Sequence, residues 1–425
     1  MTSHRGTRRA RRRWTCLGLL GAAVLAAVPA VTHAEPFVPV AGEVPFSPVL
    51  VDVLDGDLVM AGNSNLLAAG GWRVDGAAAA DVDGDTTLLC VGRRYVPAAC
   101  ADNSSSATVD IPEGARVVQA RLYVDSTLTV GVSPLRVKLD GPAAAYEYTE
   151  LGPTTPGIAK LYEGSGGGRG QPVMRQAVWD ITSYVAASGP GTYTVADIVH
   201  ERSGAWLPYA SWAIVVAYEL DPAAGVALAE LPPEAQHRFA PRAISWYDGF
   251  VVRAEGSVDV PVTGYQVVAG QPTFAKSFHV VAHAQARGAD NLLLDGGPIG
   301  NNLTPGDAPA PAGVVIGTDP RCNSTTDVLN DSICVLGSPV ETKVPGPAEY
   351  RSSADGITPT SGSAVDLDVI RIPDRYFRPG STSATLSLRA IGAPVAPGML
   401  AVSVDLPPVI DPALAPAGAP TGGTP

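Results

Sequence analysis

Short segments in which apolar and polar residues alternate, separated by glycine and proline, dominate this chain. The segment VVQARLYV (residues 117–124) places its even-numbered apolar side chains on one face and Gln119 and Arg121 on the other. A period of two residues is typical of a half-buried β-strand. The segment WAIVVAYEL (212–220) is apolar on both faces, which predicts a central strand covered on both sides. With 46 glycines and 39 prolines among 425 residues and no long helical pattern, the sequence predicts an all-β fold.

Three later segments alternate in the same way, namely SFHVVAHAQ (277–285), ATLSLRAI (384–391) and MLAVSVDL (399–406). In the first of them Phe278 and Val280 share one face, and we expect His279 and His283 on an outer face. The H-x-x-x-H spacing would bring two rings to one metal ion on a helix, but on a strand four residues span about 13 Å. This argues against a metal site made by that pair.

Two stretches have a similar order of residue types, which suggests an internal repeat. WDITSYVAASGPGTYTVADI (179–198) is followed by one strand pattern, and LDVIRIPDRYFRPGSTSATLSLRAI (367–391) by another. We expect two jelly-roll or immunoglobulin-like β-sandwich domains with long loops, at residues 35–225 and 226–406. Chance similarity between two strand–turn–strand units is the alternative explanation of this repeat. Residues 407–425 are rich in Pro, Ala and Gly, which predicts a disordered tail.

The first 34 residues are typical of a signal peptide. Six arginines precede an apolar run at residues 17–31, and Thr32-His33-Ala34 offers small residues at the usual cleavage offsets. The apolar run is short for a bilayer span, and no later stretch approaches about 20 apolar residues. We expect export with cleavage after Ala34 and no membrane span afterwards, with the Sec and twin-arginine routes both open.

Cleavage would leave an acidic protein. The full chain has 29 basic and 41 acidic residues, and removal of the six leader arginines leaves 23 basic residues and a net charge of −18. Nucleic acids and anionic membranes are bound by basic surfaces. The charge therefore argues against both classes of partner.

Four cysteines would remain after processing, and they fall into two local pairs. Nine residues separate Cys90 from Cys100, and eleven separate Cys322 from Cys334. An even number of cysteines in an exported chain favours disulfides. Of the three connectivities, we expect the local one.

The turn Asp81-Val82-Asp83-Gly84-Asp85-Thr86 carries Asp81, Asp83 and Asp85 at alternate positions, a pattern of oxygen ligands that suits calcium. Thr86 and Gly92 stand where an EF-hand needs Gly and an acid, so the turn is not an EF-hand. A shallow calcium site, with Asp55 and Asp57 as further ligands, is one interpretation. A solvated acidic turn without a cofactor is the other.

Exposed aromatic side chains on a sandwich loop can stack on sugar rings. Trp206 and Tyr209 are the candidates for such a glycan surface, and packing between strands is the alternative for both. The sequence contains no G-x-S-x-G, H-E-x-x-H or P-loop motif, and no feature selects two catalytic carboxylates from the 41 acidic residues. We therefore expect no catalytic residues and no enzymatic activity.

Several blocks taken together resemble a known group of proteins. These are DNSSSATVDIPEGARVVQARLYVDS, WDITSYVAASGPGTYTVADI, SWAIVVAYELDPAAGVALAEL, WYDGF and STSATLSL, in this order. They resemble the N-terminal β-rich globular region, of unknown function, of large exported surface proteins of Gram-positive bacteria that often carry immunoglobulin-like repeats. The chain departs from them in having no repeat array and no Leu-Pro-x-Thr-Gly sorting motif.

The resemblance implies a secreted or cell-envelope protein. We expect a structural or adhesive module whose partners are other surface proteins. A carbohydrate-binding module for cell-wall glycans, with or without calcium, is the alternative, and a secreted hydrolase is the weakest of the three hypotheses.

Overall fold

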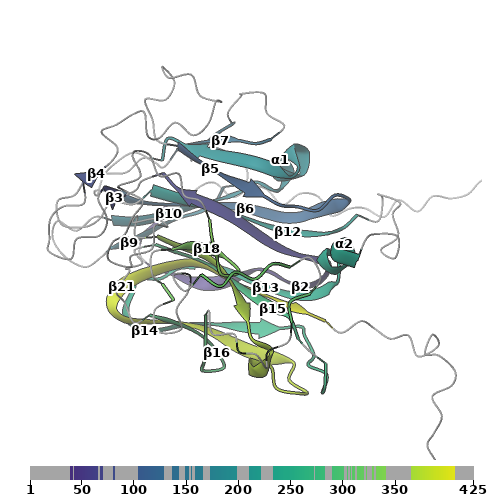
Figure 1. Cartoon of the computed structure of the whole chain (residues 1–425). Coiled ribbons are helices and arrows are strands. Elements are labelled where there is room, and N and C mark those ends of the chain that lie inside the picture. Colours follow the sequence, from purple (N-terminus) through teal and green to yellow (C-terminus); the bar gives the residue numbers. More distant parts are fainter. Residues whose placement is uncertain are drawn as a thin grey trace, which may run out of the picture. The chain divides into compact units, whose positions relative to one another are not determined.

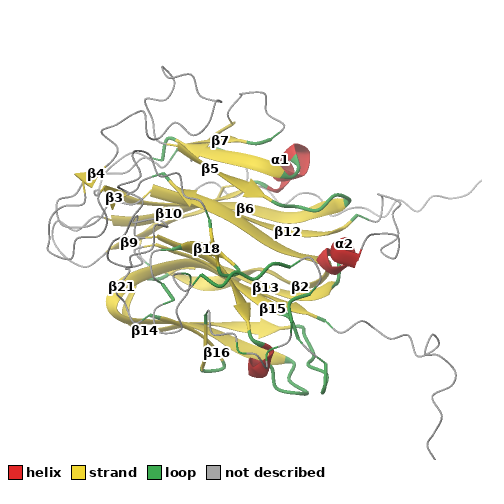
Figure 2. Cartoon of the chain, viewed as in Figure 1, coloured by secondary structure: helices red, strands yellow, loops and turns green. Residues whose placement is uncertain are grey.

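The computed structural model is all-β, with its strands stacked in layers (Figures 1 and 2). This confirms the fold class predicted from the alternating segments. The structure describes residues 39–41, 43–65, 68–69, 80–81, 104–128, 136–142, 149–152, 155, 158–165, 173–198, 210–221, 233–271, 273–282, 290–300, 304, 307, 309–311, 314–319, 322, 328–329, 332–340 and 365–406.

The first layer is an antiparallel sheet with the strand order β5-β11-β7-β8. Its strands are β5 (Ser104–Val109), β7 (Val137–Asp140), β8 (Thr149–Leu151) and β11 (Gly191–Ala196). Helix α1 (Thr182–Ser188) inserts Val185 into the core beneath this sheet.

The second and third layers belong to one continuous ladder, in the order β1-β9-β10-β6-β12-β2-β13-β21-β15-β20-β18-β19. The second layer contains β1 (Pro39–Ala41), β6 (Ala115–Leu128), β9 (Ile158–Ser165), β10 (Val173–Asp180), β12 (Ala210–Leu220) and the second half of β2 (Val44–Ser64). The third contains the first half of β2, β13 (Pro241–Phe250), β15 (Ala275–Ala282), β18 (Ile333–Val335), β19 (Ser338–Pro339), β20 (Val365–Ile372) and the second half of β21 (Ser383–Asp405). Within this ladder the pairs β1–β9 and β18–β20 are parallel.

The fourth layer forms around the first half of β21, which pairs with β14 (Arg253–Thr263) and β16 (Asn291–Leu294), and β16 pairs with β17 (Gly297–Ile299). The remaining described elements are the strand pair β3 (Ala68–Ala69) and β4 (Ala80–Asp81), helix α2 (Pro233–Arg238) and the 3-10 helix η6 (Asp374–Tyr376). No helix among the described residues has the length and apolar character needed to cross a bilayer.

Each pair of neighbouring layers encloses an apolar core, so most strands of the two inner layers are buried on both faces; the first half of β2, with Val51 and Val53 exposed, is an exception. On β6, Leu122 faces the core below the first layer, whereas Tyr123 faces the next core. On β13, Trp246 faces that middle core and Tyr247 faces the core above the fourth layer. Alternation along an inner strand therefore separates two cores rather than core from solvent.

This stacking settles the predictions made for individual strands. The segment 212–220 lies in β12, which is buried between β2 and β6, as predicted. The segment 117–124 is not simply half-buried, because its second face meets the third layer: Tyr123 is fully buried, and Arg121 pairs with Asp248.

Residues 1–34 and 407–425 lie outside the described residues, so the signal peptide and the tail stay predictions. The predicted boundary between residues 225 and 226 also lies outside them. Strands from both sides of that boundary share one ladder, because β2 pairs with β12 and with β13.

Strand β2 passes from the third layer to the second between Asp55, which pairs with β13, and Gly56, which pairs with β12. A Cβ atom at Gly56 would lie 1.9 Å from the carbonyl oxygen of Tyr218, so the crossing requires glycine. Directly after it, the buried Asp57 carboxylate contacts Lys276 of β15 at 2.5 Å. It also accepts a hydrogen bond from Ser403 of β21 at 2.7 Å.

Arg242 of β13 completes this ionic cluster. Its Nε lies 3.5 Å from Asp57 and 2.6 Å from Asp405. Burial alone would disfavour the ionised Asp57, but attraction by Arg242 and Lys276 outweighs it and lowers the pKa of Asp57 to about 2. The cluster ties β2 to three strands of the third layer at the point where β2 leaves that layer.

The substitution Asp57→Asn should lower the free energy of unfolding at pH 7 by about 3–5 kcal/mol, because the fully buried Arg242 and the largely buried Lys276 both lose the carboxylate that they share. Asp52→Asn, at an exposed position of the same strand, should change it by less than about 0.5 kcal/mol. Urea unfolding monitored by circular dichroism measures both values.

The pH dependence gives a second check. Since the folded pKa of Asp57 is lowered, its contribution is complete above the ordinary value of 3.8 and is lost as the pH falls towards about 2. The difference between wild type and Asp57→Asn should therefore shrink below pH 4. Equal losses for Asp57→Asn and Asp52→Asn would contradict this account of the crossing.

Candidate functional site

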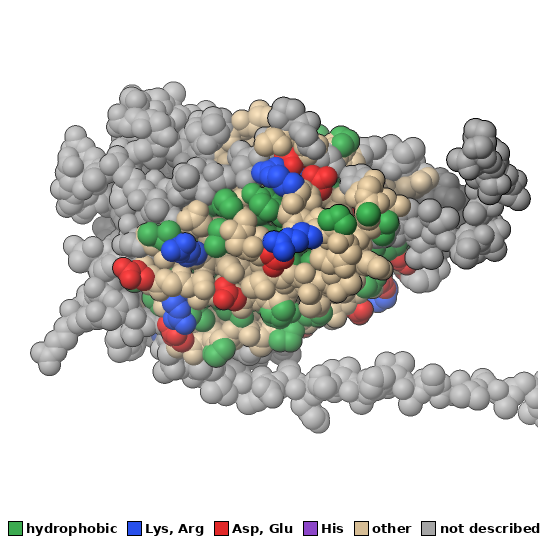
Figure 3. Space-filling model, turned by 90° about the horizontal axis from the view of Figure 1, so that it is seen from below, with side chains coloured by type: hydrophobic (Ala, Val, Ile, Leu, Met, Phe, Trp, Pro, Cys, Tyr) green, Lys and Arg blue, Asp and Glu red, His purple; other side chains and the backbone are tan. Residues whose placement is uncertain are grey.

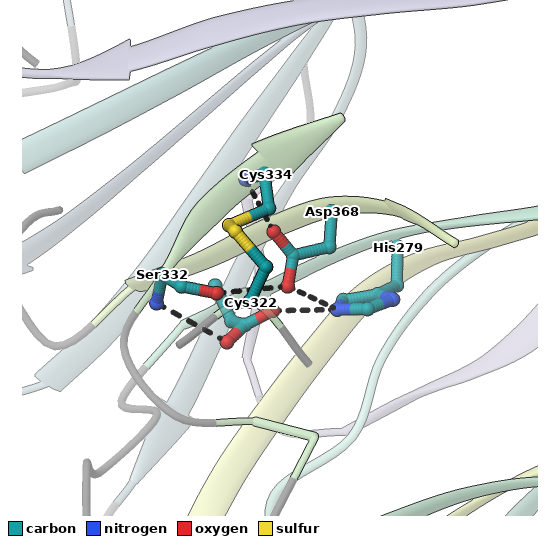
Figure 4. The surroundings of a disulfide bond; sticks show 6 residues. His279, Cys322, Ser332, Cys334 and Asp368 are labelled. Atoms are coloured by element: carbon teal, nitrogen blue, oxygen red, sulfur yellow. Dashed lines mark hydrogen bonds and ion pairs between the residues drawn. A yellow bond between two sulfur atoms is a disulfide. The ribbon is translucent and has the colours of Figure 1, made fainter. Parts of the chain in front are cut away.

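A cluster of ionisable side chains lies inside the third layer (Figure 4). His279 on β15 and Asp368 on β20 are register partners. Asp366 lies two residues before Asp368 on the same face of β20. The Nε2 atom of His279 is 2.6 Å from an oxygen of Asp366 and 3.7 Å from an oxygen of Asp368. One ligand atom from each residue lies within 4.8 Å of the others, and all three side chains are fully buried.

The two neighbouring strands bring these side chains together by alternation. Along β20, Leu367 and Val369 point into the middle core, so Asp366 and Asp368 point to the opposite face of the sheet. Along β15, Phe278 and Val280 point into the middle core, so His279 points to that same opposite face.

The expectation of an outer position for His279 is therefore wrong. The face of β15 opposite the middle core is covered by the core above the fourth layer and by the segment that carries β18. His283 lies outside the described residues. The signal that sequence reasoning missed is the D-x-D pattern of VDLDVIRI (365–372), whose two acids fall in an otherwise apolar strand.

Backbone and hydroxyl donors from strand β18 and the residue before it hold both carboxylates. Ser332 donates its amide to Asp366 at 3.3 Å and its hydroxyl to Asp368 at 3.0 Å. The amide of Cys334 donates to the other oxygen of Asp368 at 2.5 Å. These contacts fix the orientation of both carboxylates, and none of them brings a positive charge.

A disulfide fastens this donor segment. It joins Cys322 to Cys334, the pair expected from local spacing, with a Cα–Cα distance of 5.9 Å, and both cysteines are fully buried. Figure 4 shows the disulfide beside Ser332 and Asp368. The crosslink therefore holds the amide donors against the carboxylates.

The electrostatics of the cluster disfavour two negative charges. Burial, followed by repulsion from Asp366, raises the pKa of Asp368 well above its usual range. The Nδ1 atom of His279 has no hydrogen-bond partner among the described residues. Chemically, one imidazole nitrogen and two carboxylate oxygens form a donor set that can hold a shared proton or a divalent cation.

A second buried acid lies between the second and third layers. Asp125 on β6 is fully buried, and its described side-chain contact is a hydrogen bond of 3.0 Å from the amide of Gln176 on β10. Burial raises its pKa to about 8, which the hydrogen bond from Gln176 opposes. Asp125 is therefore largely protonated at neutral pH.

A cavity of about 310 Å³ lies on the far side of β18 and β20 from the cluster, between these strands and parts of β2 and β5. Among the described residues that line it, including Met60, Ile333 and Leu367, none is aromatic or charged. Sugar-binding sites use aromatic faces and convergent polar groups. The lining does not have that character.

Most site residues predicted from the sequence lie outside the described residues, namely Asp83, Asp85, Cys90, Cys100, Trp206 and Tyr209. Asp81 belongs to β4, where it pairs with Ala68 of β3. Of the two further calcium candidates, Asp55 is exposed, whereas Asp57 lies in the buried ionic cluster with Lys276. The calcium and glycan hypotheses for these residues stay predictions.

The substitution Asp125→Asn should stabilise the protein increasingly as the pH rises. The pKa of Asp125 is raised from its ordinary value of 3.8 to about 8 in the folded protein. Between these two pH values the unfolded chain releases the proton that the folded chain keeps, so the free energy of unfolding of the wild type falls as the pH rises. The advantage of Asp125→Asn over wild type should grow by about 1.4 kcal/mol per pH unit across that window. Urea unfolding at pH 5 and pH 8 measures it, with the exposed Asp259→Asn as control. An advantage that is the same at both pH values would refute this protonation state.

Removing the disulfide with Cys322→Ala/Cys334→Ala should lower the free energy of unfolding by about 3 kcal/mol, because the crosslink restricts the unfolded chain. The same pair of substitutions in a Cys90→Ala/Cys100→Ala background should cost the same amount, since local pairs close separate loops. Unfolding without reductant measures both costs. A much smaller cost in the second background would show that the four cysteines pair across the two loops.

No protein-family model matches this chain, and no curated protein matches it. Among solved structures, crystal structures of wild-type and variant BuGH86 in complex with neoagarooctaose are similar to it at 10% identity and a TM-score of 0.18. The match covers 71% of this chain and 34% of those chains, so this chain spans about a third of their length. Recombinant N-glycanase F (PNGase F) is similar at 9% identity and a TM-score of 0.20, with 72% of this chain and 89% of that chain covered. Similarity at this level supports no functional conclusion.

Proposed function

We propose that the protein is an exported, non-enzymatic module of the cell envelope that acts structurally or adhesively through contacts with other surface proteins. The observation that carries this proposal is the complete burial of His279, Asp366 and Asp368. A catalytic acid or base must come within hydrogen-bond reach of a substrate. Side chains that are sealed behind a disulfide-fastened segment serve the fold instead.

The continuity of the stack supports a structural role. Strands β2 and β21 each pass from one layer to the next without a break. Polar contacts also join the second and third layers: Arg121 pairs with Asp248, and the indole of Trp246 donates to Tyr123 at 3.0 Å. Backbone pairing and buried polar contacts together resist sliding of one layer over another.

The described surface also supports a protein partner over a nucleic acid. On the face shown in Figure 3, Lys and Arg occupy separate positions, several of them beside Asp or Glu, with apolar side chains between them. Binding to a phosphate backbone requires a continuous basic surface. The described part of this face presents none.

Export is supported by the N-terminal leader pattern and by the disulfide. A disulfide between Cys322 and Cys334 persists in an oxidising compartment. The resemblance to the globular region of Gram-positive surface proteins gives the same expectation.

The purified protein should bind isolated cell envelopes that retain their proteins, and protease treatment of those envelopes should abolish the binding. A sedimentation assay with labelled protein measures it. Saturable binding to protein-free wall polysaccharide would instead establish the carbohydrate-binding alternative. Release of sugars or peptides from the envelope would overturn the proposal in favour of a hydrolase.

The variant Trp206→Ala/Tyr209→Ala provides a matched control. Under the proposed function it should bind protein-bearing envelopes as the wild type does. A glycan surface built on these two residues should lose most of its affinity, because stacking on sugar rings depends on aromatic faces.

A further inference from the structure

We propose that His279, Asp366 and Asp368 form a closed structural site for one divalent transition-metal ion that is bound by nitrogen and oxygen ligands, such as Zn²⁺ or Mn²⁺. The proposal does not rest on the proposed function, since a structural ion is compatible with any activity of the surface. It rests on the geometry, the charge and the fixed orientation of three side chains.

The geometry suits a single ion. Zinc binds imidazole nitrogen and carboxylate oxygen at about 2.0–2.2 Å, so ligand atoms around one ion are about 3–4 Å apart. The separation from His279 Nε2 to Asp368, 3.7 Å, lies within that range, whereas the separation to Asp366, 2.6 Å, is that of a direct hydrogen bond and would have to widen when an ion binds. Neighbouring strands hold all three residues, so small side-chain rotations are enough to admit the ion.

The charge of the cluster favours a cation. Elsewhere in this protein the buried Asp57 faces Arg242 and Lys276, and the buried Asp248 faces Arg121. The interactions of Asp366 and Asp368 are with His279, with Ser332, with the Cys334 amide and with each other. No Lys or Arg side chain among the described residues contacts either carboxylate. A divalent ion neutralises both carboxylates at once.

The surroundings have the form of a second coordination sphere. Outer hydrogen bonds orient metal-binding carboxylates in proteins. Ser332 and the Cys334 amide supply such bonds to both carboxylates, and the disulfide to Cys322 holds the donors in place. Three of the four carboxylate oxygens accept a hydrogen bond from Ser332 or Cys334 and keep a lone pair for the ion. The fourth, on Asp366, contacts Nε2 of His279, which must lose its proton to bind a metal and then no longer donates to that oxygen.

The donor set selects the class of ion. Calcium takes six to eight oxygen ligands, more than this buried cluster offers. The cysteines are joined in the disulfide and offer no thiolate. An imidazole with two carboxylates suits zinc, manganese or iron(II), and the complete burial of all three side chains leaves no path for a substrate to the ion.

The test uses the whole processed chain, because a sealed site must open to admit an ion. The protein is unfolded in urea with EDTA and without reductant, refolded with or without ZnCl₂ or MnCl₂, and desalted. Wild type should retain about one ion per chain by mass spectrometry of the metal. Asp368→Asn should retain at least about tenfold less, because it loses an ionised ligand.

Asp125→Asn is the matched control, since it makes the same change at another fully buried acid and should retain the ion as wild type does. Asp368→Asn should fold, because the amide keeps an acceptor for Cys334 and removes a like-charge contact. Its circular dichroism spectrum checks this, and its thermal midpoint should not respond to zinc, whereas that of wild type should rise.

Two results would overturn the proposal. One is wild-type protein that refolds and retains neither ion. The other is folded Asp368→Asn that retains as much metal as wild type, because the ion would then be bound elsewhere, for example at Asp81, Asp83 and Asp85.

Discussion

The ionic contacts of Asp57 lie where the architecture is most constrained. At this point β2 leaves the third layer, in which it pairs with β13, and enters the second, in which it pairs with β12. The tight approach at Gly56 allows the crossing, and Lys276 and Arg242 anchor it from the third layer. Because one strand serves both layers, the faces of these layers are forced together over the middle core.

Strands that are buried on both faces in the two inner layers must satisfy their polar side chains internally. The protein does this in three ways. Asp57 and Asp248 face arginine or lysine. Asp125 has no such partner in its described contacts and keeps a proton. The cluster around His279 combines two acids with an imidazole, and no Lys or Arg among the described residues contacts these acids; this is where we propose that an ion binds.

The sequence pattern was sufficient to predict strands but not what covers them. Alternation at 384–391 predicted a strand, and this segment lies in β21 with Leu386 and Leu388 in a core, because a period of two is a local property of the strand. The same alternation predicted an outer position for His279, which is buried. Whether the second face of a strand meets solvent depends on how the layers stack, and a local pattern does not contain that information. Asp366 and Asp368 became a candidate site through the register between β15 and β20, which no local pattern encodes. The local spacing of Cys322 and Cys334, by contrast, was enough to predict that they pair.

The disulfide and the His279 cluster form one structural unit, because the disulfide positions the groups that orient the two carboxylates. Strands β15 and β20 bring the imidazole and the two carboxylates together, but the donors that orient those carboxylates come from the segment that ends in Cys334. Closure of the Cys322–Cys334 bond restricts that segment, and it therefore favours the arrangement in which the carboxylates are held and sealed. Since such bonds form and persist chiefly in oxidising compartments, the proposed export would place the chain where this closed form of the cluster is favoured.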